Sequence, residues 1–251
     1  HLSRVRGSIN RPLVVLGLLL HVGVIIGLIL LTGDLGVAVV FMGFVLLMLF
    51  CAGLSLWYFA GGAVLLAALL PIVWHILESY QQQRLLVGFH PQSEPFGYGY
   101  QPLLSRDAMM AGKRLGAGVD GGAGYAELPA AHTDFMYATL CEKLGLLCGL
   151  LVLALLVVLI VRAVVIAARC GRDTGSFLCI GIAGCLILQT IENVGMCLAL
   201  LPVVGIRLPF ISYGGSSLIS LYAMVGLVAG VFARPSPTSQ ERYIRPPYKR
   251  L

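Results

Sequence analysis

Residues 144–168 read LGLLCGLLVLALLVVLIVRAVVIAA. This run exceeds the about 20 apolar residues that an α-helix needs to cross the hydrocarbon core of a bilayer. Similar runs recur, and we expect spans near 13–31, 35–54, 57–77, 144–168, 177–201 and 213–233. Because a chain in lipid must satisfy its own backbone hydrogen bonds, each run should be a helix. The sequence therefore predicts an all-α polytopic membrane protein with about six transmembrane helices and one long extracytoplasmic loop.

The composition agrees with a single membrane domain over residues 1–251. Hydrophobic residues make up 59% of the chain and charged residues only 11%, which excludes an ordinary soluble domain. The formal net charge of +6 comes largely from the ends of the spans and from the tail 234–251. We expect this basic tail to contact anionic membrane lipids, and we expect no nucleic-acid partner.

Basic residues also give an orientation. They precede the first predicted span, separate the fourth from the fifth and follow the last: Arg4, Arg6, Arg11, Arg169, Arg172 and the basic residues of the tail. The positive-inside rule places all of these on the cytoplasmic side. The loop 78–134 then lies on the extracytoplasmic side. The first apolar run lacks a small-residue cleavage site, so we do not expect a signal peptide.

No metal or dinucleotide motif is expected. The seven cysteines lie in or beside apolar runs without CxxC spacing and are interpreted as small hydrophobic residues. Residues 116–121 match GxGxxG, but no strand precedes them and glycine is common throughout this stretch. We interpret the match as accidental.

The loop 78–134 is far longer than a connection between neighbouring helices requires, which makes it the part most suited to chemistry. Turn-forming residues divide it, and Leu103–Ala111 is predicted to form a helix along the membrane. Its charges nearly balance, so anion recognition would depend on particular arginines. Arg84 could anchor to headgroups or grip a pyrophosphate. Gln101 could bond a sugar or cap the predicted helix.

Three polar residues, His132, Thr133 and Asp134, stand where the loop enters the fourth span. Thr133 or Asp134 could cap the helix, because its first backbone N–H groups lack intrahelical partners. Alternatively, a partly shielded carboxylate at a membrane edge could act as a general base for a sugar hydroxyl. Asp34 stands at the outer edge of the second span, where a helix N-cap is the favoured interpretation, so it is only a weaker site candidate.

Two further polar groups have both structural and functional interpretations. Glu192 and Asn193 lie within a predicted span, where they could join helices or line a substrate groove. The hydroxyls of Ser212, Ser216 and Ser217 flank two glycines at a span entrance. These small residues permit close packing, or the hydroxyls and backbone N–H groups could hold phosphate.

Several of these segments resemble signature elements of the SEDS family of FtsW, RodA and SpoVE. The resemblance rests on LPFISYGGSSL at 208–218, LPAAHTDF at 128–135, YQQQR at 80–84, PFGYGYQ at 95–101 and TGDLG at 32–36. Family members usually have about ten spans, so the resemblance implies that the first four are absent here. The family commonly has acids where this chain has Ala126 and Ala130, and Glu127 could substitute for the first of these.

The resemblance implies a peptidoglycan glycosyltransferase in the bacterial inner membrane, with its active site on the extracytoplasmic side. The implied substrate is lipid II, and the implied partner is a class B penicillin-binding protein. Asp134 is the implied catalytic residue, in an inverting transfer that displaces undecaprenyl pyrophosphate. That chemistry also suggests a divalent cation, Mg²⁺ or Mn²⁺, although no ligand cluster can be read in the sequence. A lipid-linked precursor flippase and a non-catalytic scaffold are the alternative functions.

Overall fold

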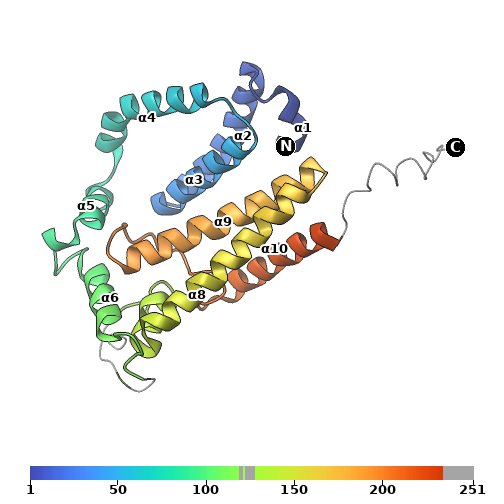
Figure 1. The fold of residues 1–251 in the computed structure, drawn as a ribbon. Coiled ribbons are helices and arrows are strands. Elements are labelled where there is room, and N and C mark those ends of the chain that lie inside the picture. Colours follow the sequence, from blue (N-terminus) through green and yellow to red (C-terminus); the bar gives the residue numbers. More distant parts are fainter. Residues whose placement is uncertain (119–120, 122–127, 234–251) are drawn as a thin grey trace.

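The computed structural model describes residues 1–118, 121 and 128–233, and the elements of this part are helices (Figure 1). In chain order they are α1 (Leu2–Val5), α2 (Pro12–Leu31), α3 (Leu35–Cys51), α4 (Leu56–Ile76), α5 (Ser79–Phe89), α6 (Tyr100–Ala111), α8 (Met136–Arg169), α9 (Asp173–Cys197) and α10 (Gly215–Ala233), with short 3-10 turns η1 (Arg6–Ser8) and η2 (Pro91–Ser93). The predicted all-α class is confirmed. The tail 234–251, Ala126 and Glu127 lie outside the described residues.

Five helices of the described part are long and apolar enough to cross a membrane, namely α2, α4, α8, α9 and α10. The second predicted span, 35–54, is the shorter helix α3 of 17 residues. It ends at Cys51 because Gly53 adopts a left-handed conformation, with φ of 85°, and turns the chain toward α4. At 1.5 Å per residue α3 is about 26 Å long, slightly less than the hydrocarbon core.

Helix α8 begins at Met136, well before the predicted Leu144, and it is broken at Gly145 (φ 85°, ψ 165°). The loop after α6 fills the break. Four backbone hydrogen bonds join the loop to α8: Leu146 N to Lys113 O (3.0 Å), Leu147 N to Arg114 O (3.3 Å), Ala117 N to Glu142 O (2.9 Å) and Gly118 N to Lys143 O (3.1 Å). The glycine-rich stretch that matched GxGxxG therefore includes residues that supply backbone partners to an interrupted helix.

Helix α9 is the centre of the bundle, since α3, α8 and α10 all pack against it (Figure 1). Its buried face includes small residues such as Ala183 and Gly184, which allow neighbouring helices to approach closely. Helix α4 has no buried residue, and Figure 1 shows it standing away from α8, α9 and α10.

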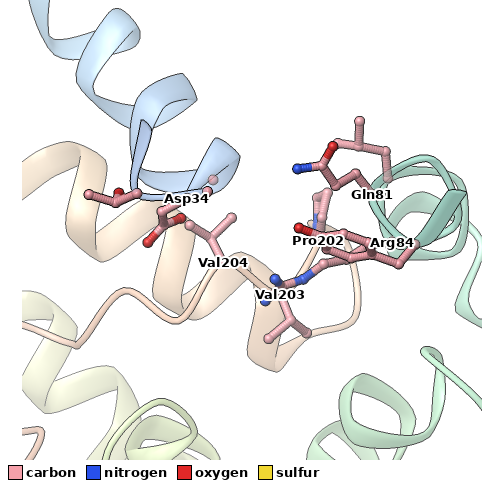
Figure 2. Close-up of a pocket in the computed structure, with 11 residues that line it drawn as sticks. Asp34, Gln81, Arg84, Pro202, Val203 and Val204 are labelled. Carbon is pink, nitrogen blue, oxygen red and sulfur yellow. The ribbon is translucent and has the colours of Figure 1, made fainter. Parts of the chain in front are cut away.

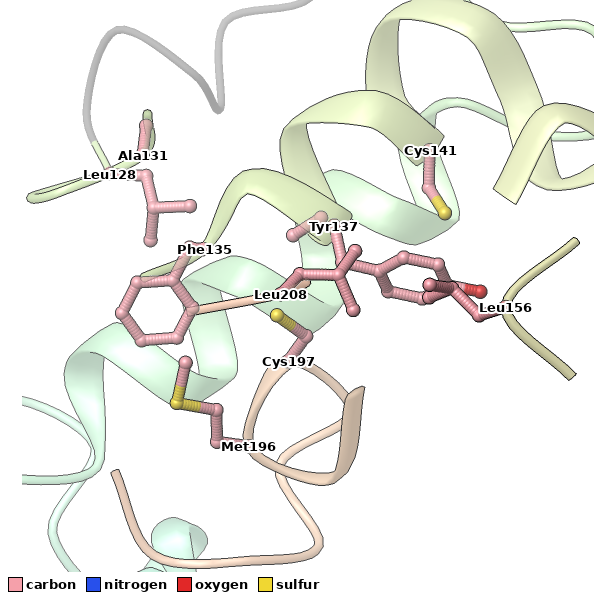
Figure 3. Packing of buried hydrophobic residues seen from close by; sticks show 10 residues of the cluster. Leu128, Ala131, Phe135, Tyr137, Cys141, Leu156, Met196, Cys197 and Leu208 are labelled. Atoms are coloured by element: carbon pink, nitrogen blue, oxygen red, sulfur yellow. The ribbon is translucent and has the colours of Figure 1, made fainter. Parts of the chain in front are cut away.

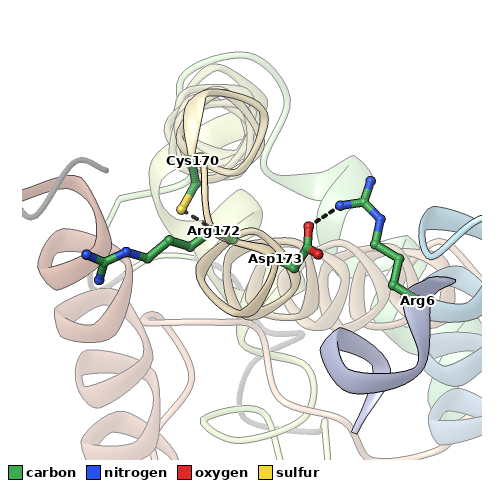
Figure 4. A network of polar contacts seen from close by, with 4 residues as sticks. All are labelled: Arg6, Cys170, Arg172 and Asp173. Carbon is green, nitrogen blue, oxygen red and sulfur yellow. Dashed lines mark hydrogen bonds and ion pairs between the residues drawn. The ribbon is translucent and has the colours of Figure 1, made fainter. Parts of the chain in front are cut away.

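At the N-terminal end of α9, Asp173 forms an ion pair with Arg6. The guanidinium of Arg6 also lies 5.7 Å from the centroid of the Phe177 ring. Beside them the thiol of Cys170 donates to the backbone oxygen of Arg172 at 3.4 Å (Figure 4). Arg6 and Arg172 are two of the basic residues that the positive-inside rule assigns to the cytoplasm. The structure places them at one end of α9, opposite the end that carries the polar site.

Candidate active site

At the C-terminal end of α9 the segments 128–135 and 208–218 pack together. The aromatic ring of Phe135 and the side chain of Leu208 are both 1% exposed and share a core cluster with Met196 and Cys197 (Figure 3). The backbone N–H of Tyr213 donates to the oxygen of His132 at 3.0 Å, and the two rings lie 6.1 Å apart. Two segments separated in sequence by the whole of α8 and α9 thus pack against each other.

Asp134 lies in the tight turn that precedes α8. Its backbone N–H donates to the oxygen of Ala130 at 3.0 Å, and its side chain is half-buried. The carboxylate approaches Gly205: a Cβ atom on that glycine would lie 3.4 Å from Asp134 Oδ2. Among the described residues no hydrogen bond or ion pair engages this carboxylate. It is therefore held in place by its backbone while both of its oxygens stay available to accept a proton.

The backbone of Asp134 is fixed by Asn193, which is fully buried in α9. The amide Nδ2 donates to the backbone oxygen of Asp134 and to that of Ile206, both at 2.7 Å. One side chain thereby ties the turn before α8 to the loop after α9. This contact favours the structural interpretation of Asn193 as a link between segments, here beside the candidate base.

A cavity of about 200 Å³ opens beside this loop. Residues from the α2–α3 turn, from α5 and from the loop after α9 line it: Thr32, Gly33, Asp34, Gly36, Tyr80, Gln81, Arg84, Leu85, Pro202, Val203 and Val204. Figure 2 shows the Arg84 side chain running from α5 toward Val203, with Asp34 beside Val204. The Arg84 guanidinium offers five N–H donors, which suit an anionic group, and the Asp34 carboxylate can accept from a hydroxyl. The cavity therefore suits a ligand with both anionic and hydroxyl groups.

Two glycines hold the loop that forms one wall of this cavity. A Cβ atom on Gly88 of α5 would lie 2.5 Å from Pro202 Cα, and one on Gly36 of α3 would collide with Val204. Pro202–Val204 is therefore seated between α3 and α5. One residue further along is Gly205, which meets the Asp134 carboxylate. The cavity and the candidate base are thus neighbours along one short strip of backbone.

The structure decides between several of the interpretations left open by the sequence. Asp34 is the N-cap of α3, since its side chain accepts from Val37 N at 3.1 Å, and it also lines the cavity. Thr133 and Asp134 do not cap α8. The N-cap is Phe135, because the turn closed on Ala130 delays the start of the helix, and its side chain has no atom that could accept a capping bond.

The other predicted site residues lie in turns and at the starts of helices. The Thr133 hydroxyl donates to Ala130 O at 3.2 Å, and the buried Ser212 hydroxyl accepts from Leu208 N at 3.0 Å, so both stabilise turns. Gln101 is the second residue of α6, which begins before the predicted 103–111, so it does not cap that helix. Ser216 and Ser217 lie in the first turn of α10, and within the described part of the chain no hydrogen bond joins either of them to Asp134.

Sequence reasoning missed Gly205 and the wall Pro202–Val204. The signal for them was weak: a proline and a glycine in a short link, which predict a turn but not its neighbours. For a metal, the described residues contain no group of three His, Cys, Asp or Glu side chains. The residues present therefore do not form a ready set of ligands for the predicted divalent cation.

The family model FtsW/RodA/SpoVE, described as cell cycle protein, matches residues 4–235. The peptidoglycan glycosyltransferase MrdB of Escherichia coli K12 is 42% identical over 202 residues, covering 79% of this chain and 54% of that protein. A probable peptidoglycan glycosyltransferase FtsW of Coxiella burnetii is 41% identical over 214 residues, covering 84% and 57%. The chain thus spans about half the length of these curated relatives.

Two solved structures have the same fold. A chain of a peptidoglycan synthase complex gives a TM-score of 0.75 at 30% identity, covering 90% of this chain and 64% of that one. A point mutant of the Thermus thermophilus rod shape determining protein RodA gives 0.63 at 27% identity, covering 94% and 63%. The resemblance seen in the sequence is confirmed, and the chain belongs to the FtsW/RodA/SpoVE family of cell cycle proteins.

Proposed function

We propose that the protein is a peptidoglycan glycosyltransferase that polymerises lipid II. The observation that carries the proposal is the Asp134 carboxylate, unengaged and next to Gly205, at the end of the backbone strip that walls the Arg84 cavity. The relatives named above as glycosyltransferases support the reaction class.

In the proposed reaction Asp134 accepts the proton of an acceptor sugar 4-hydroxyl. The oxygen then attacks the anomeric carbon of a second, lipid-linked sugar, and the bond from that carbon to the pyrophosphate oxygen breaks with inversion. Asp134 suits the base because its backbone is fixed by Asn193 while its oxygens stay free. General bases placed in this way contribute about 10²–10⁴-fold to rate.

Arg84 is the proposed contact for the departing undecaprenyl pyrophosphate. Its guanidinium borders the cavity, and it has no ion-pair partner within the described ranges. Charge-assisted bonds from arginine to phosphate oxygens are short and strong, so they would stabilise negative charge as it develops on the leaving group. No step in this scheme is assigned to a metal ion.

The proposed location is the bacterial inner membrane, with Asp134 and the cavity on the extracytoplasmic side. The basic residues beside α1 and at the α8–α9 turn support this orientation, because they lie at the opposite end of α9 from the site. A class B penicillin-binding protein is the proposed partner. The likeness to a chain of a peptidoglycan synthase complex supports a partner of this kind.

The test is glycan-strand synthesis from purified lipid II by the protein and its partner, read on a gel. Asp134→Asn should lower the rate about 10²–10⁴-fold while leaving the fold intact. Asp107→Asn is the matched control, because Asp107 is an exposed acid of α6 whose one ion pair among the described residues is with Arg106. Equal polymer from wild type and Asp134→Asn would remove Asp134 from the reaction.

The same preparation separates the two alternative functions. Movement of fluorescent lipid II across vesicles without strand synthesis would indicate a flippase. Neither transport nor strands, with the partner still bound, would indicate a scaffold.

A further inference from the structure

Arg162 is a charged residue within the apolar part of the membrane-spanning helix α8. Its side chain is exposed, and in the described part of the chain no hydrogen bond or ion pair engages its guanidinium. An unpaired charge on a helix surface that faces lipid is costly, because hydrocarbon cannot solvate it. The site around Asp134 lies at the opposite end of the bundle and does not account for this arginine.

The face of α8 that carries Arg162 is turned away from the bundle. Ile160, Ala163 and Ala167 are buried against α9 and α10. At about 100° per residue Arg162 lies on the far side of the helix, and Arg169, seven residues later, returns to within about 20° of it. Exposed apolar residues continue this stripe toward the middle of the membrane, namely Leu151, Leu155 and Val158. The two arginines are thus the charged end of an apolar stripe that faces outward.

The two arginines also bracket one boundary of the membrane. At Gly145 the loop 113–118, which carries a lysine and an arginine, bonds to α8, so Gly145 marks the polar edge on that side. Along the helix axis Arg162 lies about 26 Å beyond Gly145, and Arg169 lies about 36 Å beyond it. A usual tilt of about 20° shortens these lengths by only about 2 Å. Because the hydrocarbon core is about 30 Å thick, Arg162 is just inside its far boundary and Arg169 just outside it.

A lipid phosphate lies at the depth that these two side chains share. The long side chain of an arginine just inside the hydrocarbon can extend its guanidinium to the headgroups, where phosphate oxygens accept strong charge-assisted bonds. Among the described residues the acid at this end of the bundle is Asp173, and it is already paired with Arg6. Figure 4 shows Arg172 pointing away from that pair. The positive charge of the stripe therefore favours a lipid with a net negative headgroup over a zwitterionic one.

We propose that Arg162 and Arg169 bind the phosphate of one anionic phospholipid, such as phosphatidylglycerol, in the leaflet that meets the α8–α9 turn. This is the cytoplasmic leaflet in the orientation proposed above. The acyl chains of the lipid lie along the apolar stripe of α8. The inference does not depend on the reaction assigned to Asp134, which lies toward the other leaflet.

The test is native mass spectrometry of the detergent-solubilised protein with dioleoyl phosphatidylglycerol or dioleoyl phosphatidylcholine. The affinity of the first bound lipid is measured for each. The wild type should prefer phosphatidylglycerol. Arg162→Gln should weaken phosphatidylglycerol binding about fivefold and leave phosphatidylcholine binding unchanged. Arg11→Gln is the matched control, because it removes the same charge at the same end of the bundle from α2, which packs on α3. It should change the affinity less than about twofold.

Arg169→Gln is the second variant, and it should weaken phosphatidylglycerol binding by a similar factor. Both arginines are exposed, so neither change leaves a cavity, and the midpoint of thermal unfolding should stay at the wild-type value. In the double variant the loss should differ from the product of the two single losses, because both residues act on one phosphate.

Three results would overturn the inference. The first is wild-type phosphatidylglycerol affinity in both single variants, and the second is an equal loss in Arg11→Gln. The third is a pair of independent losses, which would assign the two arginines to separate lipids. Unchanged lipid affinity in Arg162→Gln together with lost binding of a partner's membrane helix would assign the stripe to a protein instead.

Discussion

The side-chain amide of Asn193 donates to the backbone oxygen of Asp134 at 2.7 Å, across 59 residues of sequence. Its second bond, to Ile206 O, has the same length. The position of the candidate base is thus set from α9 rather than by the helix that follows it.

Asn193→Asp should destabilise the protein and abolish strand synthesis. The new carboxylate would face two backbone oxygens and donate to neither, at a cost of about 3 kcal/mol or more. Thermal unfolding in detergent and the gel assay measure both effects. Thr190→Val is the control, because it removes a hydrogen bond that is local to α9, Thr190 Oγ1 to Leu186 O at 2.7 Å. Similar losses for both variants would contradict a specific role for Asn193.

Gly205→Ala should lower strand synthesis more than it lowers stability. The residue has φ of 82°, so any side chain costs about 1–2 kcal/mol in backbone strain. Its methyl group would also lie in van der Waals contact with the Asp134 carboxylate, 3.4 Å from Oδ2. Gly53→Ala carries the same strain at φ 85° with nothing within 4 Å. Activity lost equally in the two variants would show that backbone strain, and not contact with Asp134, is responsible.

Gly145→Ala should be among the most destabilising single changes in the chain. The new Cβ atom would lie 2.5 Å from the backbone nitrogen of Gly116, inside the loop that fills the break in α8. We expect a loss of about 3 kcal/mol or more, since backbone cannot move aside as a side-chain tip can. Gly118 also has a positive φ, of 89°, but in the described structure nothing lies within 4 Å of an added Cβ atom. Gly118→Ala should therefore destabilise the protein only through backbone strain. The midpoint of thermal unfolding distinguishes them, and equal midpoints would refute the tight approach.

Arg6→Gln should change stability by less than about 1 kcal/mol, although it breaks an ion pair with Asp173. Both side chains are about half exposed, at 55% and 46%, so water screens their attraction. The wild-type unfolding midpoint should likewise shift little between low and high salt. A large salt dependence that disappears in Arg6→Gln would show that this pair holds η1 to α9.

Much of the fold followed from the sequence. Apolar runs located the helices that became α2, α4, α8, α9 and α10, because hydrophobic length is a local property. The sequence did not locate the first and last residues of these helices as well as it located their apolar middles. The run at 144–168 marked the apolar part of α8 but not its first turns, which precede Gly145 and depend on hydrogen bonds from residues 113–118.

For the site, the sequence by itself determined the chemistry available: an aspartate in HTDF, an arginine in YQQQR and an acid within a span. The sequence is sufficient for this, because the identity of a residue and of its neighbours in a motif does not depend on how the chain folds. Only the tertiary structure decided that the Asp134 carboxylate lies against Gly205 and that Arg84 and Asp34 share a cavity. Those relations arise where segments far apart in sequence pack around the end of α9, and packing between distant segments leaves no periodic signal in the chain.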